Sequence, residues 1–169
     1  YVGSHVVLEL MNMGQEVVIL DNLSVGRRSS LSTDANFYIG DVGDTGLIER
    51  IILAHDVKTI IHMAAITSVP YSLAHPEETY LTNTVKSQAL MEAALKMGIY
   101  RFIFSSVSAV YGQQKVERVA EEHPLAPDTP YGDSKASFEA ILQDAAKNRK
   151  NFSYAILRCF NIAGVDKEQ

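Results

Sequence analysis

Short apolar runs along the chain alternate with longer segments in which apolar residues recur every three or four positions. The runs are rich in Val, Ile and Phe and show no strict alternation of apolar with polar side chains. They lie at 16–20, 36–40, 58–65, 101–106 and 153–161. Such runs are typical of parallel strands that are covered on both faces.

The segments between these runs have the periodicity of amphipathic helices. We expect helices from the start of the chain to about Gly14, and at 44–56, 76–98 and 131–147. The helix at 76–98 opens with Pro and two Glu and closes with Gly, as helix termini favour. Because strands and helices alternate, we predict a doubly wound α/β fold with a parallel sheet.

The whole chain, residues 1–169, is expected to form a single domain. It contains no internal repeat, linker or low-complexity segment, and its length suits one domain. The chain opens inside a helical pattern and closes after a strand-like run, so we expect the fold to be truncated at both ends.

Composition argues against several classes of partner. The net charge of −5 disfavours nucleic acid, because binding phosphates requires a basic surface. Cys159 is the only cysteine, so we expect no disulfide framework, no metal site and a reducing, cytoplasmic compartment. No apolar run approaches the roughly 18 residues of a membrane span, so we expect no membrane partner.

Asp21 lies where a doubly wound fold binds its ligand, beyond the carboxyl end of a strand and 18 residues after Gly3. A carboxylate there can accept hydrogen bonds from a ribose diol and repels a 2′-phosphate, which favours NAD over NADP. Arg27 and Arg28 argue weakly for NADP. The alternative is that Asp21 is a solvated turn residue.

Asp41 occupies the equivalent place after the next strand, where it could meet an adenine or instead cap a helix. The glycine-rich loop that binds phosphates in such folds cannot be recognised. Gly3 is the one residue of this chain that could belong to it.

Two tyrosines are followed by a lysine four residues later, Tyr111 with Lys115 and Tyr131 with Lys135. Lys115 falls in a polar loop, whereas Tyr131 follows a proline and begins the helix at 131–147. Residues four apart on a helix are neighbours, so Lys135 is expected to lie beneath Tyr131. Only the second pair therefore predicts a fixed geometry.

A phenol next to an ammonium can act as a base. The free phenol has a pKa of about 10, and a cation within about 4–6 Å lowers it by one unit or more. We expect Tyr131 to accept a proton from a substrate alcohol whose carbon gives up hydride to NAD, with Lys135 also holding a ribose hydroxyl. The alternative is an exposed tyrosine beside a solvated lysine.

A hydroxyl that orients the substrate should lie at the end of a neighbouring strand. The segment SSVS supplies Ser105, Ser106 and Ser108 at the end of the run 101–106. Serine is also common in ordinary turns, and this alternative stays open.

Several motifs together resemble those of the extended short-chain dehydrogenase/reductase family, and within it the NAD-dependent nucleotide-sugar epimerases such as the UDP-glucose 4-epimerases. In chain order they are YVGSHVVLEL, DNLSVGRRSSL, GDV, HMAA, the segment around Asn83, FIFSSVSAVYG, PYGDSK and RCFNIAG. The resemblance covers nearly the whole chain. It implies a Rossmann-like NAD-binding domain, with a C-terminal substrate domain absent from these residues and a homodimer possible.

The resemblance also implies residue roles. Tyr131 would be the catalytic base with Lys135 as its partner, and Asn161 would bind the nucleotide sugar. Cofactor contacts are implied for Gly3, Asp21, Asn22, Asp41, Val42, Ala64, Ala65, Tyr131 and Lys135. The implied reaction is C4 epimerisation of UDP-glucose and UDP-galactose, in which bound NAD transiently oxidises the UDP-hexose to a 4-keto sugar.

The chain departs from this family at two positions. Val107 stands where those epimerases carry a catalytic Ser or Thr, so we nominate Ser106, although a shift of one residue turns a strand side chain to the other face. Thr67 replaces a lysine that UDP-glucose 4-epimerases often have, which leaves the sugar open.

Two alternative functions remain. A 4,6-dehydratase or decarboxylase of the same family would need a carboxylic acid where Ser108 and Ala109 stand. A non-catalytic dinucleotide-binding fragment is favoured by Val107 and by the missing phosphate loop, and disfavoured by the intact pair of Tyr131 and Lys135.

Overall fold

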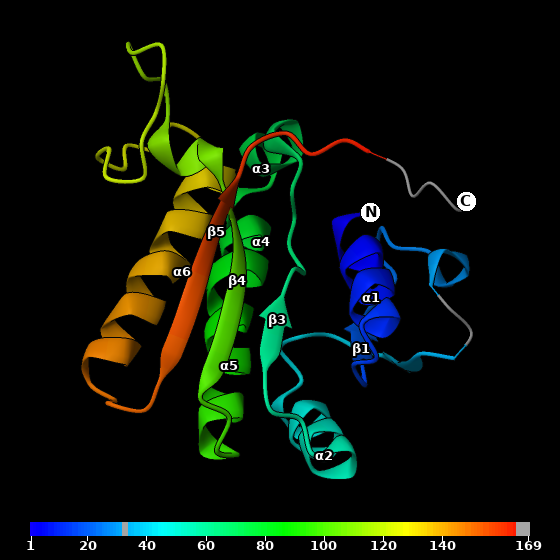
Figure 1. The fold of residues 1–169 in the computed structure, drawn as a ribbon. Coiled ribbons are helices and arrows are strands. Elements are labelled where there is room, and N and C mark those ends of the chain that lie inside the picture. The colour runs from blue at the N-terminus through cyan, green and yellow to red at the C-terminus, as the bar shows by residue number, and fades with distance from the viewer. Residues whose placement is uncertain (32–33, 165–169) are drawn as a thin grey trace.

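The computed structural model describes residues 1–31 and 34–164 (Figure 1). Strands and helices follow one another along the chain as the sequence predicts. The strands are β1 (Val18–Asp21), β2 (Asn36–Ile39), β3 (Ile60–His62), β4 (Arg101–Val107) and β5 (Ser153–Cys159). The α-helices are α1 (Val2–Asn12), α2 (Thr45–His55), α3 (Val69–Ala74), α4 (Pro76–Tyr80), α5 (Ser87–Lys96) and α6 (Pro130–Lys147). Short 3-10 turns span Arg28–Ser30 and Ser108–Tyr111.

All strand pairs in the described residues are parallel, but they form two sheets rather than one. β1 pairs with β2 from Val18 opposite Asn36, and β3, β4 and β5 form a second sheet in that order. β4 and β5 are paired along their whole length, so that Val107 lies opposite Cys159 at their carboxyl ends. The doubly wound α/β class is confirmed, and a single continuous sheet is not present among the described residues.

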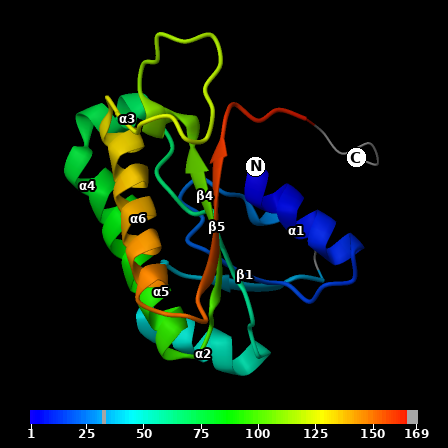
Figure 2. The same cartoon turned by 60° about the vertical axis from the view of Figure 1, so that its left-hand side comes forward.

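Helices α5 and α6 pack on one side of the three-stranded sheet, and α1 lies on the other side of the molecule (Figure 2). The core between the sheet and α5 and α6 is aromatic. The Phe138 ring of α6 meets the Phe104 ring of β4 edge to face at 4.7 Å, and Phe102 lies 6.0 Å from Phe138. All three side chains are at most 2% exposed.

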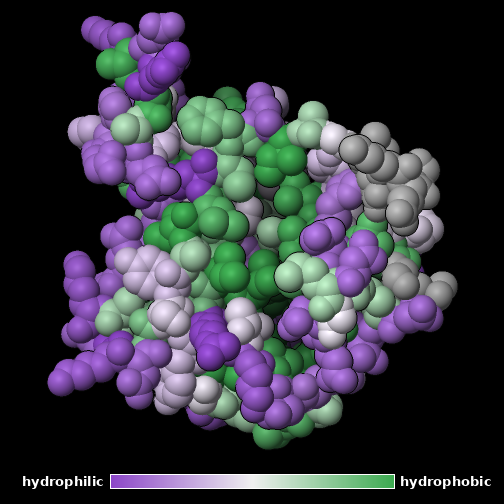
Figure 3. All heavy atoms as spheres, viewed as in Figure 1, coloured by the Kyte–Doolittle hydropathy of each residue, from purple (hydrophilic) through white to green (hydrophobic). Residues whose placement is uncertain are grey.

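Cover on both faces, expected for every strand, is absent from the outer face of β5. Leu157 on this face is 43% exposed, and Ala155 beside it is exposed as well. Apolar side chains gather over β3 to β5 on the face seen in Figure 1 (Figure 3).

The helix expected at 76–98 is present with an irregularity. Residues Leu81–Lys86 form a π-helical segment between α4 and α5, and this segment buries Asn83. Helix α3 was not predicted. It begins in the loop after β3, where the Ser68 hydroxyl caps it by accepting from the Tyr71 N–H.

Candidate active site

Helix α6 begins immediately before Tyr131 for local reasons. The Thr129 hydroxyl accepts a hydrogen bond from the Gly132 N–H at 3.1 Å, and Pro130 occupies the first helical position. Gly132 lets this end approach the turn after β4, since a Cβ there would lie 2.5 Å from the Ala109 carbonyl oxygen. The glycine between the tyrosine and the lysine is therefore required by packing.

Tyr131 and Lys135 lie on the same buried face of α6 and are 9% and 3% exposed. The Lys135 ammonium lies over the Phe104 ring, 4.3 Å from its centroid. Both side chains interact electrostatically with Cys159, which ends β5 opposite Val107. The pair thus lies at the carboxyl ends of β4 and β5, where ligands of such folds bind.

Burial dominates the ionisation of both groups. It lowers the pKa of Lys135 from 10.5 to about 7, although Glu139 and Cys159 favour the charged form. Burial, and to a lesser extent Cys159, raises the pKa of Tyr131. The sequence predicted a lowered pKa for this phenol, and for the chain without a bound cofactor that prediction was wrong. The reason is that removing the phenol from water disfavours its anion.

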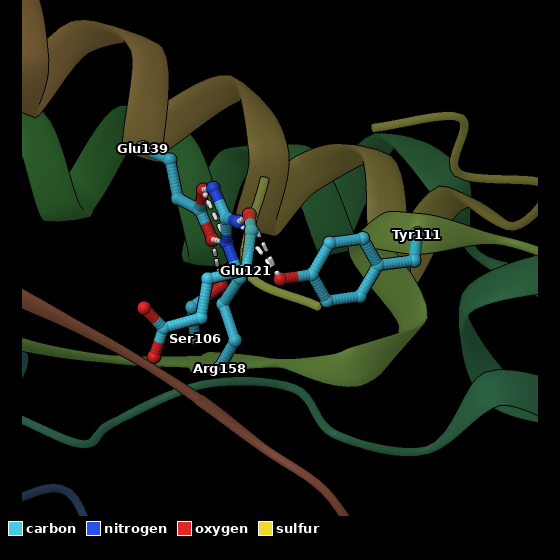
Figure 4. A network of polar contacts seen from close by, with 5 residues as sticks. All are labelled: Ser106, Tyr111, Glu121, Glu139 and Arg158. Carbon is cyan, nitrogen blue, oxygen red and sulfur yellow. Dashed lines mark hydrogen bonds and ion pairs between the residues drawn. The ribbon is translucent and has the colours of Figure 1, made fainter. Parts of the chain in front are cut away.

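The hydroxyl of Ser106 does not face Tyr131. Side chains alternate along β4, so Phe104 and Ser106 are buried beneath α6 while Val107 turns to the other face. Ser106 donates a hydrogen bond to the buried Glu139 carboxylate, one helical turn beyond Lys135 (Figure 4). The structure therefore places the nominated serine in an ionic network, where its proton is already engaged.

The second tyrosine–lysine pair is not brought together. Tyr111 is buried in the 3-10 turn after β4 and receives a hydrogen bond from Arg158 at 2.9 Å, whereas Lys115 is exposed in the following loop. Equal spacing in sequence thus gives a shared face only where a helix carries both residues.

Asp21 ends β1, as expected for a residue that binds a ribose. Its Oδ1 accepts from the Leu23 N–H at 2.7 Å, and Leu23 has a φ of 58° in the tight turn that follows. Its Oδ2 has no hydrogen-bond donor among residues 1–31 and 34–164. A Cβ on Gly26 would lie 3.0 Å from that oxygen, so glycine keeps the oxygen accessible.

Asp41 lies close to Asn22, and the ends of β1 and β2 therefore meet. Its carboxylate accepts from Lys86 Nζ and from the Gly43 N–H, each at 2.8 Å. Burial alone would raise the pKa of Asp41, but the hydrogen bonds from Lys86, Gly43 and Asn22 and the charge of Lys86 together hold it below its ordinary value. Asp41 is thus engaged within the protein, while the helix that follows is capped by Asp44.

The remaining predicted contacts lie at the same ends of the strands or near them. Gly3 is in the first turn of α1, where a Cβ would be 3.9 Å from Met63. Val42 follows β2 and is half-buried, and Ala64 and Ala65 follow β3. Asn161 is exposed beyond β5.

Asn83 was not predicted as a site residue, although it holds the site together. Its amide accepts from the Ile66 N–H at 2.8 Å and donates to the Ile66 carbonyl and to Ser134, whose hydroxyl donates to the Tyr131 carbonyl. The loop after β3 is thereby tied to the start of α6. The sequence offered two signals, a polar asparagine inside a predicted amphipathic helix and the place of its segment among the motifs of the family resemblance.

These residues fit a bound dinucleotide. The Lys135 side chain is 3% exposed and its Nζ has no hydrogen-bond partner among the described residues, and Asp21 Oδ2 has none there either. NAD would be held by Asp21 at its adenosine ribose and by Lys135 at the ribose next to nicotinamide. No group of three or more His, Cys, Asp or Glu residues suited to a metal occurs in the described ranges.

Parallel strands alternating with helices, a carboxylate with a free oxygen at the end of β1 and a buried tyrosine–lysine pair beside β4 and β5 are typical of a dinucleotide-binding protein of the doubly wound class. Residues 1–169 match the NAD dependent epimerase/dehydratase family, and the chain belongs to that family.

Relatives and solved structures agree with this assignment. The chain is 39% identical over 172 residues to the UDP-glucose 4-epimerase of Haemophilus influenzae, covering 97% of the chain and 51% of that protein. It is similar to the structure of a Brucella ovis UDP-glucose 4-epimerase in complex with NAD, with a TM-score of 0.93, 31% identity and coverage of 98% and 50%. For a Thermotoga maritima UDP-glucose 4-epimerase with UDP-glucose, the TM-score is 0.89 at 36% identity, covering 94% and 52%. The chain thus spans about half the length of these proteins.

Proposed function

We propose that this chain supplies the NAD-binding part and the acid–base pair of a nucleotide-sugar epimerase that interconverts UDP-glucose and UDP-galactose at C4. The observation that carries the proposal is the Lys135 side chain, which is buried on the same face of α6 as Tyr131 and whose Nζ has no hydrogen-bond partner among the described residues. The substrate follows from similarity to UDP-glucose 4-epimerases, one of which was solved with UDP-glucose.

The proposed chemistry assigns one proton to Tyr131. Bound NAD supplies reversible hydride transfer at C4 of the sugar. Tyr131 Oη takes the C4 hydroxyl proton as the alcohol becomes a ketone and returns it when the alcohol reforms. Lys135, when charged, stabilises the phenolate and donates to the cofactor ribose, which offsets the rise in pKa that burial causes in Tyr131.

Other residues of the chain hold this arrangement. Asp21 and Asn22 bind the adenosine ribose, Val42 and the backbone next to Asp41 border the adenine, and Asn161 contacts the nucleotide sugar. Gly3, Ala64 and Ala65 line the path of the cofactor. Ser106 enters as a positioning residue, because its hydroxyl donates to Glu139. Homodimerisation and a cytoplasmic location remain predictions, and no helix in the described ranges is long and apolar enough to cross a membrane.

The test uses the protein expressed from its complete gene. Incubation with UDP-glucose should produce UDP-galactose and transient NADH fluorescence. Tyr131→Phe should retain NAD and lose about 10²–10⁴-fold in kcat, the usual contribution of a general acid–base group. Tyr154→Phe, which changes a half-exposed tyrosine of β5, is the matched control and should keep full activity.

The alternatives predict different outcomes. A 4,6-dehydratase would release a 4-keto-6-deoxy sugar, but Ser108 and Ala109 provide no carboxylic acid for the elimination. A non-catalytic dinucleotide-binding protein would bind NAD without turning over any UDP-hexose. Either result would overturn the epimerase proposal.

A further inference from the structure

A buried ion pair lies directly behind the tyrosine–lysine pair. Tyr131, Lys135 and Glu139 follow one another at intervals of four on the buried face of α6, so each stacks on the next. Glu139 is 1% exposed, and its carboxylate accepts hydrogen bonds from Arg158 Nε at 3.1 Å and from Arg158 Nη2 at 2.8 Å. Ser106 donates to the same carboxylate (Figure 4).

Arg158 is itself held from the opposite side. Its Nη1 donates to the Tyr111 hydroxyl at 2.9 Å and to the Glu121 carbonyl at 2.8 Å. The network therefore joins β4, β5, the turn after β4, the following loop and α6 at one point. An arginine anchored on three sides fixes the position of the Glu139 carboxylate closely.

Stability alone is a weak explanation for this arrangement. Moving both charges out of water costs about as much as their attraction returns, and apolar residues of similar volume often serve a fold equally well. What distinguishes this pair is its neighbour, a second buried cation one helical turn away. The charge of Glu139 is the main influence that opposes the lowering of the Lys135 pKa by burial.

We propose that Glu139 is a positioning residue of this site, whose carboxylate, held by Arg158 and Ser106, provides a fixed negative charge one helical turn from the Lys135 ammonium. This inference rests on the proposed function, because the role of Lys135 in the reaction is part of that function. Removal of the carboxylate leaves Lys135 neutral over more of the neutral pH range, so the phenolate of Tyr131 loses its cation.

The groups that face Lys135 come from three elements besides the Phe104 ring. They are Tyr131 and Glu139 on α6, His62 on β3 and Cys159 on β5. Burial lowers the pKa of His62 to about 3, so His62 stays neutral in the working range. Glu139 and Cys159 are therefore the groups whose charge can support that of Lys135.

The experiment compares the pH dependence of kcat for Glu139→Gln and wild type in the complete protein. In Glu139→Gln, the pH at which kcat falls on the alkaline side of the profile should be lower by about one unit. At pH values above that point, kcat should be roughly tenfold lower than in wild type, as expected for the loss of one close opposite charge. Asp144→Asn removes an exposed carboxylate from the same helix and should leave the profile unchanged. Ser106→Ala keeps the charge of Glu139 and should shift the profile less than Glu139→Gln.

A double variant separates electrostatics from folding. In Glu139→Gln, the partly buried Arg158 loses its opposite charge, and stability in urea should fall. Glu139→Gln combined with Arg158→Gln should recover stability but keep the shifted profile. Recovery of the wild-type profile in the double variant, or an unshifted profile in Glu139→Gln, would show that Glu139 is structural only.

A second readout does not depend on substrate. Lys135→Met is compared with the protein that keeps Lys135, and the difference in their free energies of unfolding is followed against pH. When both proteins also carry Glu139→Gln, the pH at which this difference changes should be lower by about one unit. If this shift is seen in a protein without epimerase activity, the proposed function fails while the role of Glu139 stands. If activity is present and the shift is absent, the role of Glu139 fails alone.

Discussion

Lys135 Nζ lies 4.3 Å from the centroid of the Phe104 ring, so a cation on α6 rests against the aromatic core beneath β4. The ring offers the ammonium an electrostatic partner without competing for its protons. The hydrogen-bonding capacity of Lys135 thus stays available for a ligand, at the cost of a charge held away from water.

That cost gives stability a defined dependence on pH. Burial lowers the pKa of Lys135 from 10.5 to about 7, so the unfolded chain binds the proton more tightly. The loss of folding stability that comes from burying the charged Lys135 is complete below about pH 7 and decreases as the pH rises towards 10.5. Lys135→Met should therefore gain stability over wild type at pH 6, and this gain should shrink at pH 9 in urea unfolding. Lys147→Met, at the exposed end of α6, should show no such trend, and a pH-independent gain for Lys135→Met would refute the assignment.

Asp21 should determine cofactor choice. Asp21→Asn removes the charged acceptor for the ribose diol and should weaken NAD binding about tenfold, since hydrogen bonds to charged groups contribute roughly 1.5 kcal/mol or more. Discrimination against NADP should narrow, because the repulsion of the 2′-phosphate is lost. Titration with both cofactors measures the two effects. Glu16→Gln makes the same change in charge at an exposed position and should alter neither. An unchanged ratio of NAD to NADP affinity in Asp21→Asn would count against the site.

The aromatic core should be sensitive to truncation of Phe138. Its ring is 0% exposed and meets Phe104 at 4.7 Å. Phe138→Ala should lower the free energy of unfolding by about 3–5 kcal/mol through lost burial and the cavity left behind. Leu53→Ala, at a position 71% exposed, should change it by less than about 0.5 kcal/mol. Equal losses for the two variants would mean that the core lies elsewhere.

Two glycines with positive φ should respond differently to alanine. Gly112 has a φ of 62°, and a Cβ there would lie 1.9 Å from the Ala126 carbonyl oxygen. Gly98 has a φ of 81° and no atom within 4 Å of such a Cβ. Gly98→Ala should cost about 1–2 kcal/mol from backbone strain alone. Gly112→Ala should cost clearly more, because the backbone of the loop must also move. Thermal unfolding of the two variants decides the comparison, and similar losses would contradict the close approach at Ala126.

The order of strands and helices was accessible from local patterns, because burial imposes a period on each element separately. Helix α3 escaped prediction because its six residues are too few to show a period. The π-helical segment also escaped, because its register depends on Asn83 bonding to Ile66, a contact between distant parts of the chain.

The candidate site was partly predictable for the same reason. Asp21 follows an apolar strand in the sequence, and its place at the end of β1 needs no other element. Asp41 follows a strand too, but its ion pair with Lys86 spans 45 residues. The pKa of Tyr131 was predicted in the wrong direction, because a spacing of four residues reports the neighbouring lysine and says nothing about burial.

The amino-acid sequence by itself determined that Tyr131, Lys135 and Glu139 share one face of a helix, since 3.6 residues per turn settle that locally. Tertiary structure alone decided what this face meets: Phe104 beneath the ammonium, and Arg158 and Ser106 around the carboxylate. These partners come from strands distant in sequence, and only their packing removes the charges from water.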